Sequence, residues 1–255
     1  TQKGLNVSGA SAKLLGGDAS FDGSTQADGS LRFSGQGQVS AEGLRRATEL
    51  GALSRLASHL SGQAGYRASL GFVRGQPEVS ITSNLVGMTS DLPAPLRKAP
   101  EAPLPLRYQS ALATDLAPGA SPRDTLRFEL GSIVQAQYQR ELGPDGPRVL
   151  SGGIGINEPA PAPGSGVRVS ANLVSLPLDA WEGIASRLAG PAAPGGREAG
   201  DVAGYLPTQI ALRAQTLDTS ARQFSRVVIG ASQEDGRWRA NVEAEQFGGY
   251  VEYRP

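Results

Sequence analysis

The sequence of 255 residues contains no cysteine and a single histidine. Without cysteine the chain has no disulfide bonds, no thiolate nucleophile and no cysteine-ligated metal. One histidine rules out a histidine-rich metal site, and His59 lies beside the apolar stripe of a helical pattern, which favours a structural role over catalysis. These absences remove much of the common chemistry of enzymes.

Aromatic residues are also scarce, at 5% of the chain, and no apolar run approaches the length of a membrane-spanning helix. A core would therefore be built mainly from Leu, Val, Ile and Ala. The formal net charge is zero, with 24 basic and 24 acidic residues. Because nucleic-acid-binding proteins usually have a basic excess, we expect no nucleic-acid partner.

The motifs of catalytic and cofactor sites are missing as well. The glycine-rich "SGGIGIN" (151–157) lacks the Gly-Lys-Ser/Thr ending of a phosphate loop and runs into a proline-rich stretch instead of a helix. No nucleophile, base and orienting residue can be grouped from the sequence. We predict a protein that is not an enzyme and binds no cofactor or metal; a hydrolase that uses only carboxylates is the alternative left open.

Glycine and proline are abundant instead, with 34 and 18 residues, which favours frequent turns over long helices. Between the turns, apolar and polar residues alternate as in strands. The pattern is clear in four stretches: "YRASLGF" (66–72), "TLRFELG" (125–131), "VRVSANL" (167–173) and "WRANVEA" (238–244). Strands with one apolar and one polar face are typical of antiparallel sheets with one wet face, so the sequence predicts a mainly β fold.

Two segments have the spacing of amphipathic helices. In the first, 41–62, Ser40 stands at the N-cap position and Gly62 at the C′ position. The second covers 175–190. Its apolar stripe is formed by Leu178, Trp181, Ala185 and Leu188. The fold class is therefore a β-rich α+β fold with two amphipathic helices.

Each predicted helix follows a strand and precedes a meander. This order predicts two strand–helix–meander modules, residues 1–156 and 167–255, joined by a linker at 157–166. Within the first module, residues 92–105 carry five prolines between two predicted strands. Because proline lacks the N–H that a central strand needs, this segment must leave the sheet. We favour an extended strap that packs its leucines over the sheet; a plain surface crossover loop is the alternative.

Three passages resemble proteins of the YhdP family, which belongs to the AsmA-like group and is related to TamB. They are "ITSNLVGMTSDLPAPLRKAPEAPLPLRY" (81–108), "RVSANLVSLPLDAW" (168–181) and "TLDTSARQFSRVVIGASQEDGRWRANVEAEQFGGYVEY" (216–253). The resemblance implies a periplasmic segment of a protein that is anchored in the inner membrane of Gram-negative bacteria. Such a protein moves phospholipid toward the outer membrane and maintains its permeability barrier. The implied fold is a long, curved antiparallel sheet that forms an open apolar groove.

In such a groove the ligand is a phospholipid acyl chain, whose burial is favourable by about 0.8 kcal/mol per CH₂. We expect the groove to be drawn from apolar residues of the alternating strands: Leu70, Phe72, Ile81, Leu85, Leu126, Phe128, Leu130, Val169, Leu212, Val228, Trp238 and Val242. Proteins of the inner and outer membranes remain as further candidate partners.

Two other functions stay open. One is a structural or assembly module that binds no lipid and contacts another envelope protein through its sheet edge or helix stripe. The weakest alternative is a carbohydrate-active β domain. That function requires clustered aromatic residues on an exposed sheet face, and the aromatic residues here are scattered along the chain.

Overall fold

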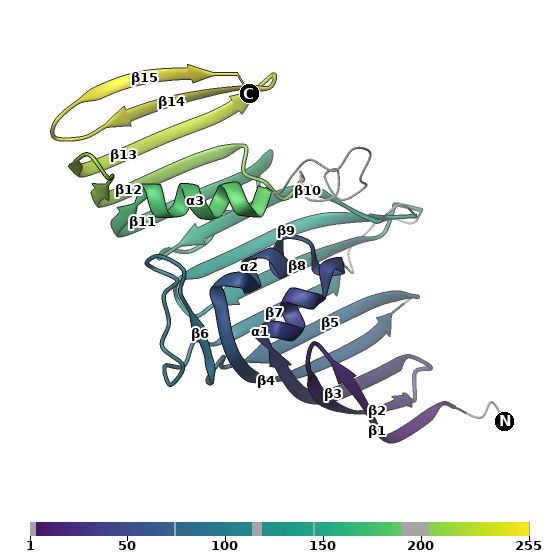
Figure 1. Ribbon diagram of the computed structural model, residues 1–255. Coiled ribbons are helices and arrows are strands. Elements are labelled where there is room, and N and C mark those ends of the chain that lie inside the picture. Colours follow the sequence, from purple (N-terminus) through teal and green to yellow (C-terminus); the bar gives the residue numbers. More distant parts are fainter. Residues whose placement is uncertain (1–3, 74, 114–118, 145, 190–203, 255) are drawn as a thin grey trace. The chain divides into compact units, whose positions relative to one another are not determined.

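The structure is a computed structural model that describes residues 4–254 except 74, 114–118, 145 and 190–203 (Figure 1). The chain divides into two compact units. Unit 1 contains Thr1–Leu92 and Arg97–Gly131, and unit 2 contains Pro93–Leu96 and Ser132–Pro255. Both units are mainly β, as the alternating pattern predicts.

In unit 1 every neighbouring pair of strands is antiparallel, in the order β1-β2-β3-β4-β5-β7-β8. The short strand β6 pairs with the start of β4. Among the described residues the first and last strands of this path do not pair with each other, so the sheet is open. The bounds are β1 (Asn6–Leu14), β2 (Gly17–Thr25), β3 (Leu31–Ser40), β4 (Leu60–Val73), β5 (Gln76–Ser83), β6 (Met88–Ser90), β7 (Leu106–Leu112) and β8 (Arg123–Leu130).

The helical segment between β3 and β4 begins where the sequence predicts. The amide of Gly43 donates a hydrogen bond to the Ser40 side-chain oxygen over 3.0 Å, which confirms Ser40 as the N-cap. A single helix over 41–62 is wrong, however. The segment consists of short pieces: α1 (Ala41–Arg46), η1 (Thr48–Leu50), α2 (Ala52–Leu56) and η2 (Ala57–His59).

Two glycines explain why this helix is interrupted. Gly51 has a φ of 57°, which a right-handed helix does not allow, and it separates η1 from α2. Gly62 is not a helix C′ residue, because β4 has already begun at Leu60. It has a φ of 84°, and a Cβ there would overlap the carbonyl of Gly87 beside β6.

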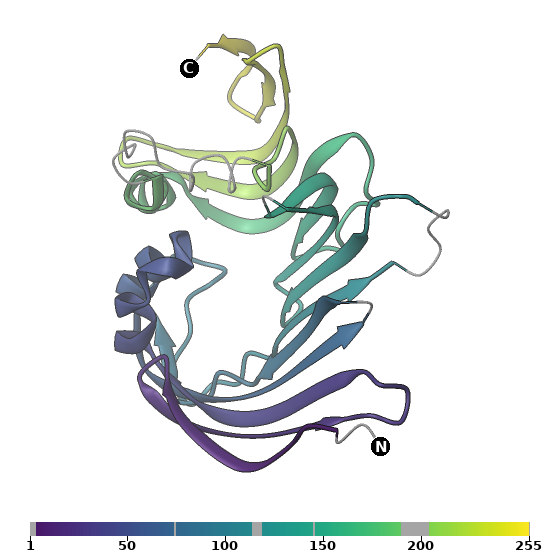
Figure 2. The ribbon, with the colours of Figure 1, turned by 90° about the vertical axis from the view of Figure 1, so that its right-hand side faces the viewer.

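The core of unit 1 lies where this helical segment meets the sheet. Buried residues from α1, η2, β4 and β6 form it: Leu44, Ala57, Ala64 and Met88. The Arg45 guanidinium holds the pieces together by donating to the carbonyls of Ala57 and Leu60, each over 3.0 Å. Figure 2 shows the helices lying over one end of β3 and β4. The segment therefore covers one end of one sheet face.

In unit 2 the strand order is β9-β10-β11-β12-β13-β14-β15. The bounds are β9 (Val134–Gly143), β10 (Gly146–Ile156), β11 (Gly166–Pro177), α3 (Leu178–Ala189), β12 (Gln209–Asp218), β13 (Gln223–Glu234), β14 (Arg237–Glu243) and β15 (Gly248–Tyr253). The strands from β12 onward form the antiparallel meander that the turn pattern predicts. The pairs β10–β11 and β11–β12 are parallel, which is a departure from the expected antiparallel sheet.

The proline-rich stretch 157–166 causes the first parallel pair. It was expected to separate two modules, but it joins the paired strands β10 and β11 and so lies inside unit 2. The stretch passes directly over β10, because a Cβ at Gly153 or Gly155 would overlap its backbone at Pro161 or Glu158. The glycines of "SGGIGIN" therefore make room for a close crossover.

The helix α3 makes the second parallel pair by returning the chain from β11 to β12, and Figure 1 shows it lying over these strands. Its buried residue is Ile184, whereas the predicted stripe residues Leu178 and Ala185 are exposed. Trp181 is partly buried, and its indole N–H donates to the carbonyl of Ala94 over 3.1 Å. The predicted stripe was therefore wrong at Leu178 and at Ala185. The side chain of Leu188 lies outside what the structure describes.

The proline-rich segment 92–105 is folded back on β6 rather than fully extended. Ser90 and Lys98 form an antiparallel bridge, and Leu92 between them is buried. The buried Lys98 ammonium donates to the carbonyl of Met88 over 2.7 Å. Pro93–Leu96 at the tip of this turn belong to unit 2. Leu92 therefore packs as the strap hypothesis expects, but the segment turns back on itself instead of running extended.

Candidate functional site

Cross-strand pairing gathers the apolar side chains of unit 1 on one face of its sheet. Ile81 on β5 lies opposite Tyr108 on β7, and Tyr108 lies opposite Phe128 on β8. Directly opposed residues point to the same side of a sheet. The register extends this face from β3 to β8: Leu31, Phe33, Leu70, Phe72, Val79, Ile81, Leu106, Tyr108, Leu126, Phe128 and Leu130.

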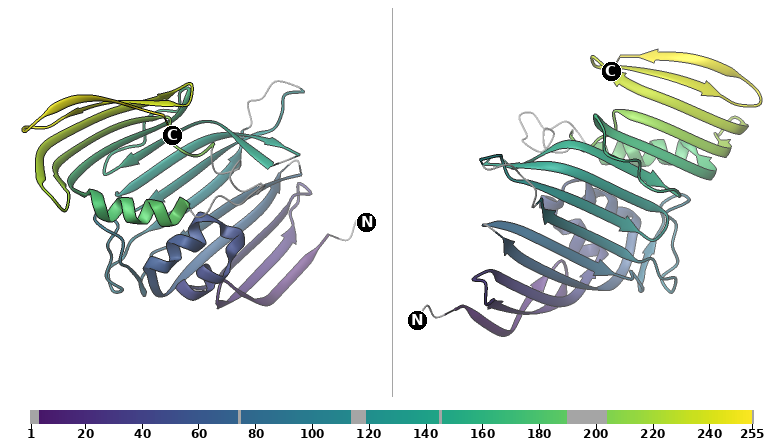
Figure 3. Two further views of the ribbon diagram at one scale, coloured as in Figure 1. Left: turned by 45° about the horizontal axis from the view of Figure 1, so that its top comes forward. Right: turned by 180° about the vertical axis from the view of Figure 1, so that it is seen from behind.

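This apolar face is only partly covered. Its residues near the helical segment, such as Ala64, are buried, whereas Phe33, Leu70, Ile81 and Phe128 are partly exposed. The described helices lie on one side of each unit's own sheet, and the view from behind shows strands in front of them (Figure 3). An accessible apolar surface of this kind is characteristic of ligand or partner binding.

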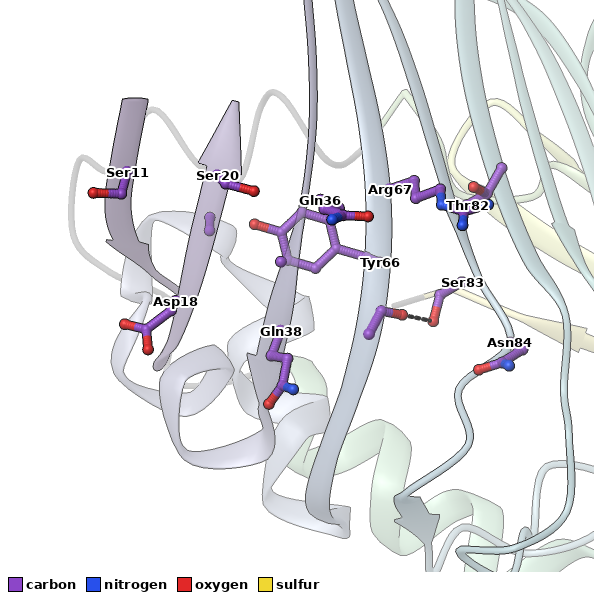
Figure 4. Close-up of a pocket in the computed structure, with 13 residues that line it drawn as sticks. Ser11, Asp18, Ser20, Gln36, Gln38, Tyr66, Arg67, Thr82, Ser83 and Asn84 are labelled. Atoms are coloured by element: carbon purple, nitrogen blue, oxygen red, sulfur yellow. Dashed lines mark hydrogen bonds between the residues drawn. The ribbon is translucent and has the colours of Figure 1, made fainter. Parts of the chain in front are cut away.

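The opposite face of unit 1 is polar and is hollowed over β1 to β5. Figure 4 shows the side chains that line an open hollow of about 870 Å³. Ser20, Gln36, Arg67 and Thr82 follow one another across the strands in one row. Asp18 and Arg67 are its charged lining residues among those described. The hollow offers hydroxyl and amide groups to water but groups no catalytic set.

Unit 2 repeats the division into an apolar and a polar face. Ala171 on β11 is paired with Leu212 on β12, which lies opposite Ile229 on β13, and Ile229 lies opposite Val242 on β14. Burial is greatest where α3 overlies β11 and β12. The buried cluster there consists of Ala171, Leu173, Ala214, Leu217 and Val227. Farther along the same face, Trp238 is only partly buried.

Most of the groove residues expected from the sequence lie on these two apolar faces, and two do not. Leu85 lies beyond the end of β5 with a φ of 52° and packs against the core beneath the helical segment. Val228 points to the polar face, because it lies opposite Arg213 and Glu243, and its side chain is 44% exposed. Arg226 has a φ of 51° and drops out of the ladder between Ser225 and Val227, so counting in steps of two from Phe224 places Val228 on the wrong face.

The apolar faces also carry polar groups that the sequence did not single out. In unit 1, the buried Ser110 hydroxyl donates to the carboxylate of buried Asp124 over 2.6 Å. In unit 2, buried Arg140 donates to the Tyr205 hydroxyl over 3.0 Å, and the Tyr138 hydroxyl donates to the Tyr205 carbonyl over 3.2 Å. Sequence alternation does not locate such pairs, because their members lie far apart in the chain.

In the group formed by Tyr138, Arg140 and Tyr205, the Tyr138 phenol has the most clearly shifted pKa. Burial raises the pKa of Tyr138 to about 12, and the neighbouring Tyr205 adds to the shift. The two rings meet edge to face with centroids 5.1 Å apart. A phenol that stays protonated in this way acts as a hydrogen-bond donor and not as a general base.

Other kinds of site find no support in the described part of the chain. His59 lies in η2 with its Nε2 atom buried and without a hydrogen-bond partner there. Within the same residues, no three His, Cys, Asp or Glu side chains gather as metal ligands. The helices that the structure describes are too short or too polar to cross a bilayer.

Comparison with known families gives a match that covers residues 1–255. The family model described as "YhdP protein" matches residues 1–255. No curated protein and no solved structure matches the chain. The match agrees with the three passages at 81–108, 168–181 and 216–253. The chain belongs to the YhdP family.

Proposed function

We propose that the apolar faces of the two units bind phospholipid acyl chains. On this proposal the chain is a periplasmic segment of an inner-membrane-anchored protein that conducts phospholipid toward the outer membrane and so maintains the outer-membrane barrier. Membership of the YhdP family supports the envelope role. The observation that carries the proposal is the row of partly exposed apolar side chains that runs across each sheet.

The physical driving force is the removal of acyl chains from water. Each buried CH₂ group contributes about 0.8 kcal/mol, so a few methylenes against Ile81, Tyr108 and Phe128 outweigh thermal motion. The side chains on the face need no reactivity, because binding and release make and break no covalent bond. We therefore propose a function without catalysis.

The buried Ser110–Asp124 pair bears on how a lipid would lie on this face. Its two members face the same side as Tyr108 and Leu126 but satisfy each other within 2.6 Å. A satisfied polar pair costs an adjacent acyl chain little, whereas an unsatisfied one would repel it. An acyl chain could therefore lie along this apolar face and pass beside the Ser110–Asp124 pair.

A second candidate function is a binding module for another envelope protein. Strand β15 favours it, because Tyr250, Val251 and Tyr253 are more than half exposed and no described strand pairs with its outer edge. An exposed edge of this kind accepts a strand from a partner. In that case the apolar faces would pack against protein and not against lipid.

Native mass spectrometry of the purified chain separates the two functions. We expect co-purified phospholipid with the wild type and with Thr82→Gln, which changes the polar face, and its loss with Ile81→Gln, which changes the apolar face. Circular dichroism shows whether each variant is folded. A folded wild-type chain that carries no phospholipid but captures an envelope protein would favour the module.

A further inference from the structure

The polar face of unit 2 contains a hollow of about 520 Å³ that has no role in acyl-chain binding. Two neighbouring rows of paired residues line it. The first row runs from β11 to β14 and consists of Arg168, Gln209, Ser232 and Arg239, and Glu252 continues it on β15 outside the lining. The second runs from β11 to β15 and consists of Ser170, Ala211, Gly230, Asn241 and Tyr250.

Side-chain size explains why the sheet is hollowed here. Ala211 and Gly230 form the centre of the second row, and a Cβ at Gly230 would meet no atom within 4 Å. Longer side chains stand around them, with Tyr250 at one side and the linker residue Pro161 at the other. The result is a floor of small residues bounded by hydrogen-bonding groups.

The described lining of the hollow includes two arginines and no aspartate or glutamate. Two carboxylates lie beside Arg239 at its edge: Glu234, and Glu252, which is paired with Arg237. Arg168 lies beneath the linker, where its guanidinium occupies the position that a side chain at Gly164 would need. The Nε atom of Arg168 is buried and has no hydrogen-bond partner in the described part of the chain. A buried charged donor left unpaired is costly, so an acceptor from outside the chain would be favourable.

The second arginine is held only loosely. Arg239 donates to the carboxylate of Glu234 over 3.1 Å, and the two side chains are 47% and 65% exposed. An exposed ion pair of this kind contributes little to stability, so Arg239 is free to exchange Glu234 for a ligand. The hollow therefore presents one partly buried guanidinium, whose Nε atom lacks a partner among the described residues, and one exchangeable guanidinium.

We propose that this hollow binds a phosphate monoester. Guanidinium groups match phosphate oxygens with paired hydrogen bonds, and the doubly charged ester balances the two arginines. The neutral side chains of Gln209, Ser232 and Asn241 then form hydrogen bonds with the polar group that carries the phosphate. The same chemistry occurs in soluble polyol phosphates and in the headgroup of phosphatidic acid.

Isothermal titration of the whole chain tests this site with three probes: inorganic phosphate, sn-glycerol 3-phosphate and dihexanoyl phosphatidic acid. We expect saturable binding of at least one phosphate monoester. Loss of a charge-assisted hydrogen bond predicts binding weaker by about tenfold or more in Arg168→Gln and in Arg239→Gln. Tighter binding of glycerol phosphate indicates a soluble ligand, and tighter binding of the short-chain lipid indicates a headgroup.

Arg222→Gln is the matched control. Arg222 is exposed in the β12–β13 turn, so this substitution removes the same charge outside the hollow. It should change affinity by less than about twofold, because exposed charges act weakly at a distance. Absence of saturable binding with all three probes, or equal weakening by Arg222→Gln and Arg239→Gln, would overturn the proposal. Arg239 is an exposed strand residue, so its variant remains informative if Arg168→Gln does not fold. The result is independent of acyl-chain binding, which uses the opposite face.

Discussion

The two units connect a strand to the next strand through a helical segment, but they do so in different ways. In unit 1, the end of β3 pairs with the start of β4, since Ser40 lies opposite Gln63. The chain must therefore return close to the point where it left the sheet. In unit 2, β11 and β12 are parallel, so the chain must travel back along the whole strand.

This difference in connectivity accounts for the difference in helix structure. A return to the same point requires short pieces that reverse direction, and the breaks after α1 and at Gly51 provide them. A return along the strand suits a continuous helix, and α3 runs for 12 residues, or about 18 Å. In both units the helix buries an aliphatic side chain, Leu44 in α1 and Ile184 in α3. Both helical segments therefore cover one end of their sheet's apolar face, but the backbone reaches that position by a different route in each unit.

The largest expected effects come from removing the two anchors, Leu44 in α1 and Ile184 in α3. Alanine at either position should lower the free energy of unfolding by about 3 kcal/mol, because it leaves a cavity in a packed region. Urea unfolding measures the loss. Trp181 and Trp238 are the chain's tryptophans, so fluorescence follows unit 2, while far-UV circular dichroism follows both units.

Leu53 in α2 is the control for the anchors, because its side chain is 44% exposed. Its replacement by alanine should cost less than about 0.5 kcal/mol. A similar loss for Leu53→Ala and Leu44→Ala would mean that α1 is not anchored as described.

A smaller effect is expected at the close crossover that distinguishes unit 2. In Gly155→Ala the new Cβ would overlap backbone atoms of Glu158 and Pro159, which cannot move aside as a side-chain end can. We expect a loss of about 2 kcal/mol in the free energy of unfolding, measured by fluorescence in urea. Gly230→Ala enters open space in the same sheet and should leave stability nearly unchanged. Equal stability of the two variants would contradict a linker packed on β10.

Glycines in the two helical segments should respond in opposite directions. Gly51 has a φ of 57°, so Gly51→Ala should destabilise the protein by about 1 kcal/mol through backbone strain alone. Gly183 lies inside α3 with no atom within 4 Å of a new Cβ, so Gly183→Ala should stabilise it by about 1 kcal/mol. Thermal unfolding of both variants checks the signs. Two shifts of the same sign would refute the contrast between a broken and a continuous helix.

Up to about pH 10.5, the smallest effects are expected in the alkaline pH dependence of stability. The folded pKa of Tyr138 is about 12, against an ordinary value of 10.0, so unfolding releases a proton between these values. Stability from Tyr138 is thus complete below about pH 10 and lost as the pH rises toward 12. Tyr138→Phe should flatten this decline in urea unfolding measured from pH 9 upward.

Lys98 in unit 1 should act with the opposite sign. Burial lowers the pKa of Lys98 below 10.5, so the unfolded chain holds more protons than the folded one at alkaline pH. Its contribution to stability therefore rises as the pH increases toward 10.5. Lys98→Met should remove that rise. A variant pair that leaves both pH slopes unchanged would show that neither group is buried as described.

The sequence predicted the strands whose alternation is regular, such as 125–131 and 238–244, because burial of one face imposes that pattern directly. It did not predict the parallel pairs. Alternation is the same in parallel and antiparallel strands, and the route of the linker 157–166 depends on glycines whose role appears only when β10 is packed. The break at Gly51 was also missed, since a glycine in a helical pattern can be tolerated.

The candidate site was predictable in its apolar part only. Phe128 and Leu212 could be placed on an inner face by counting in steps of two. Val228 could not, because Arg226 has a left-handed φ of 51° and interrupts the alternation there. The hollow beside Arg168 depends on cross-strand register, which brings together residues from β11 to β15 that are far apart in sequence.

Photo-crosslinking tests most directly whether lipid binds the apolar faces. A photoreactive residue is placed at Phe128 or at its outward neighbour Arg127 in unit 1, and at Leu212 or Arg213 in unit 2. Each variant is irradiated in the presence of phospholipid. We predict strong lipid labelling at Phe128 and Leu212 and little at Arg127 and Arg213. Equal labelling at the two members of each pair would contradict acyl-chain binding on the apolar faces.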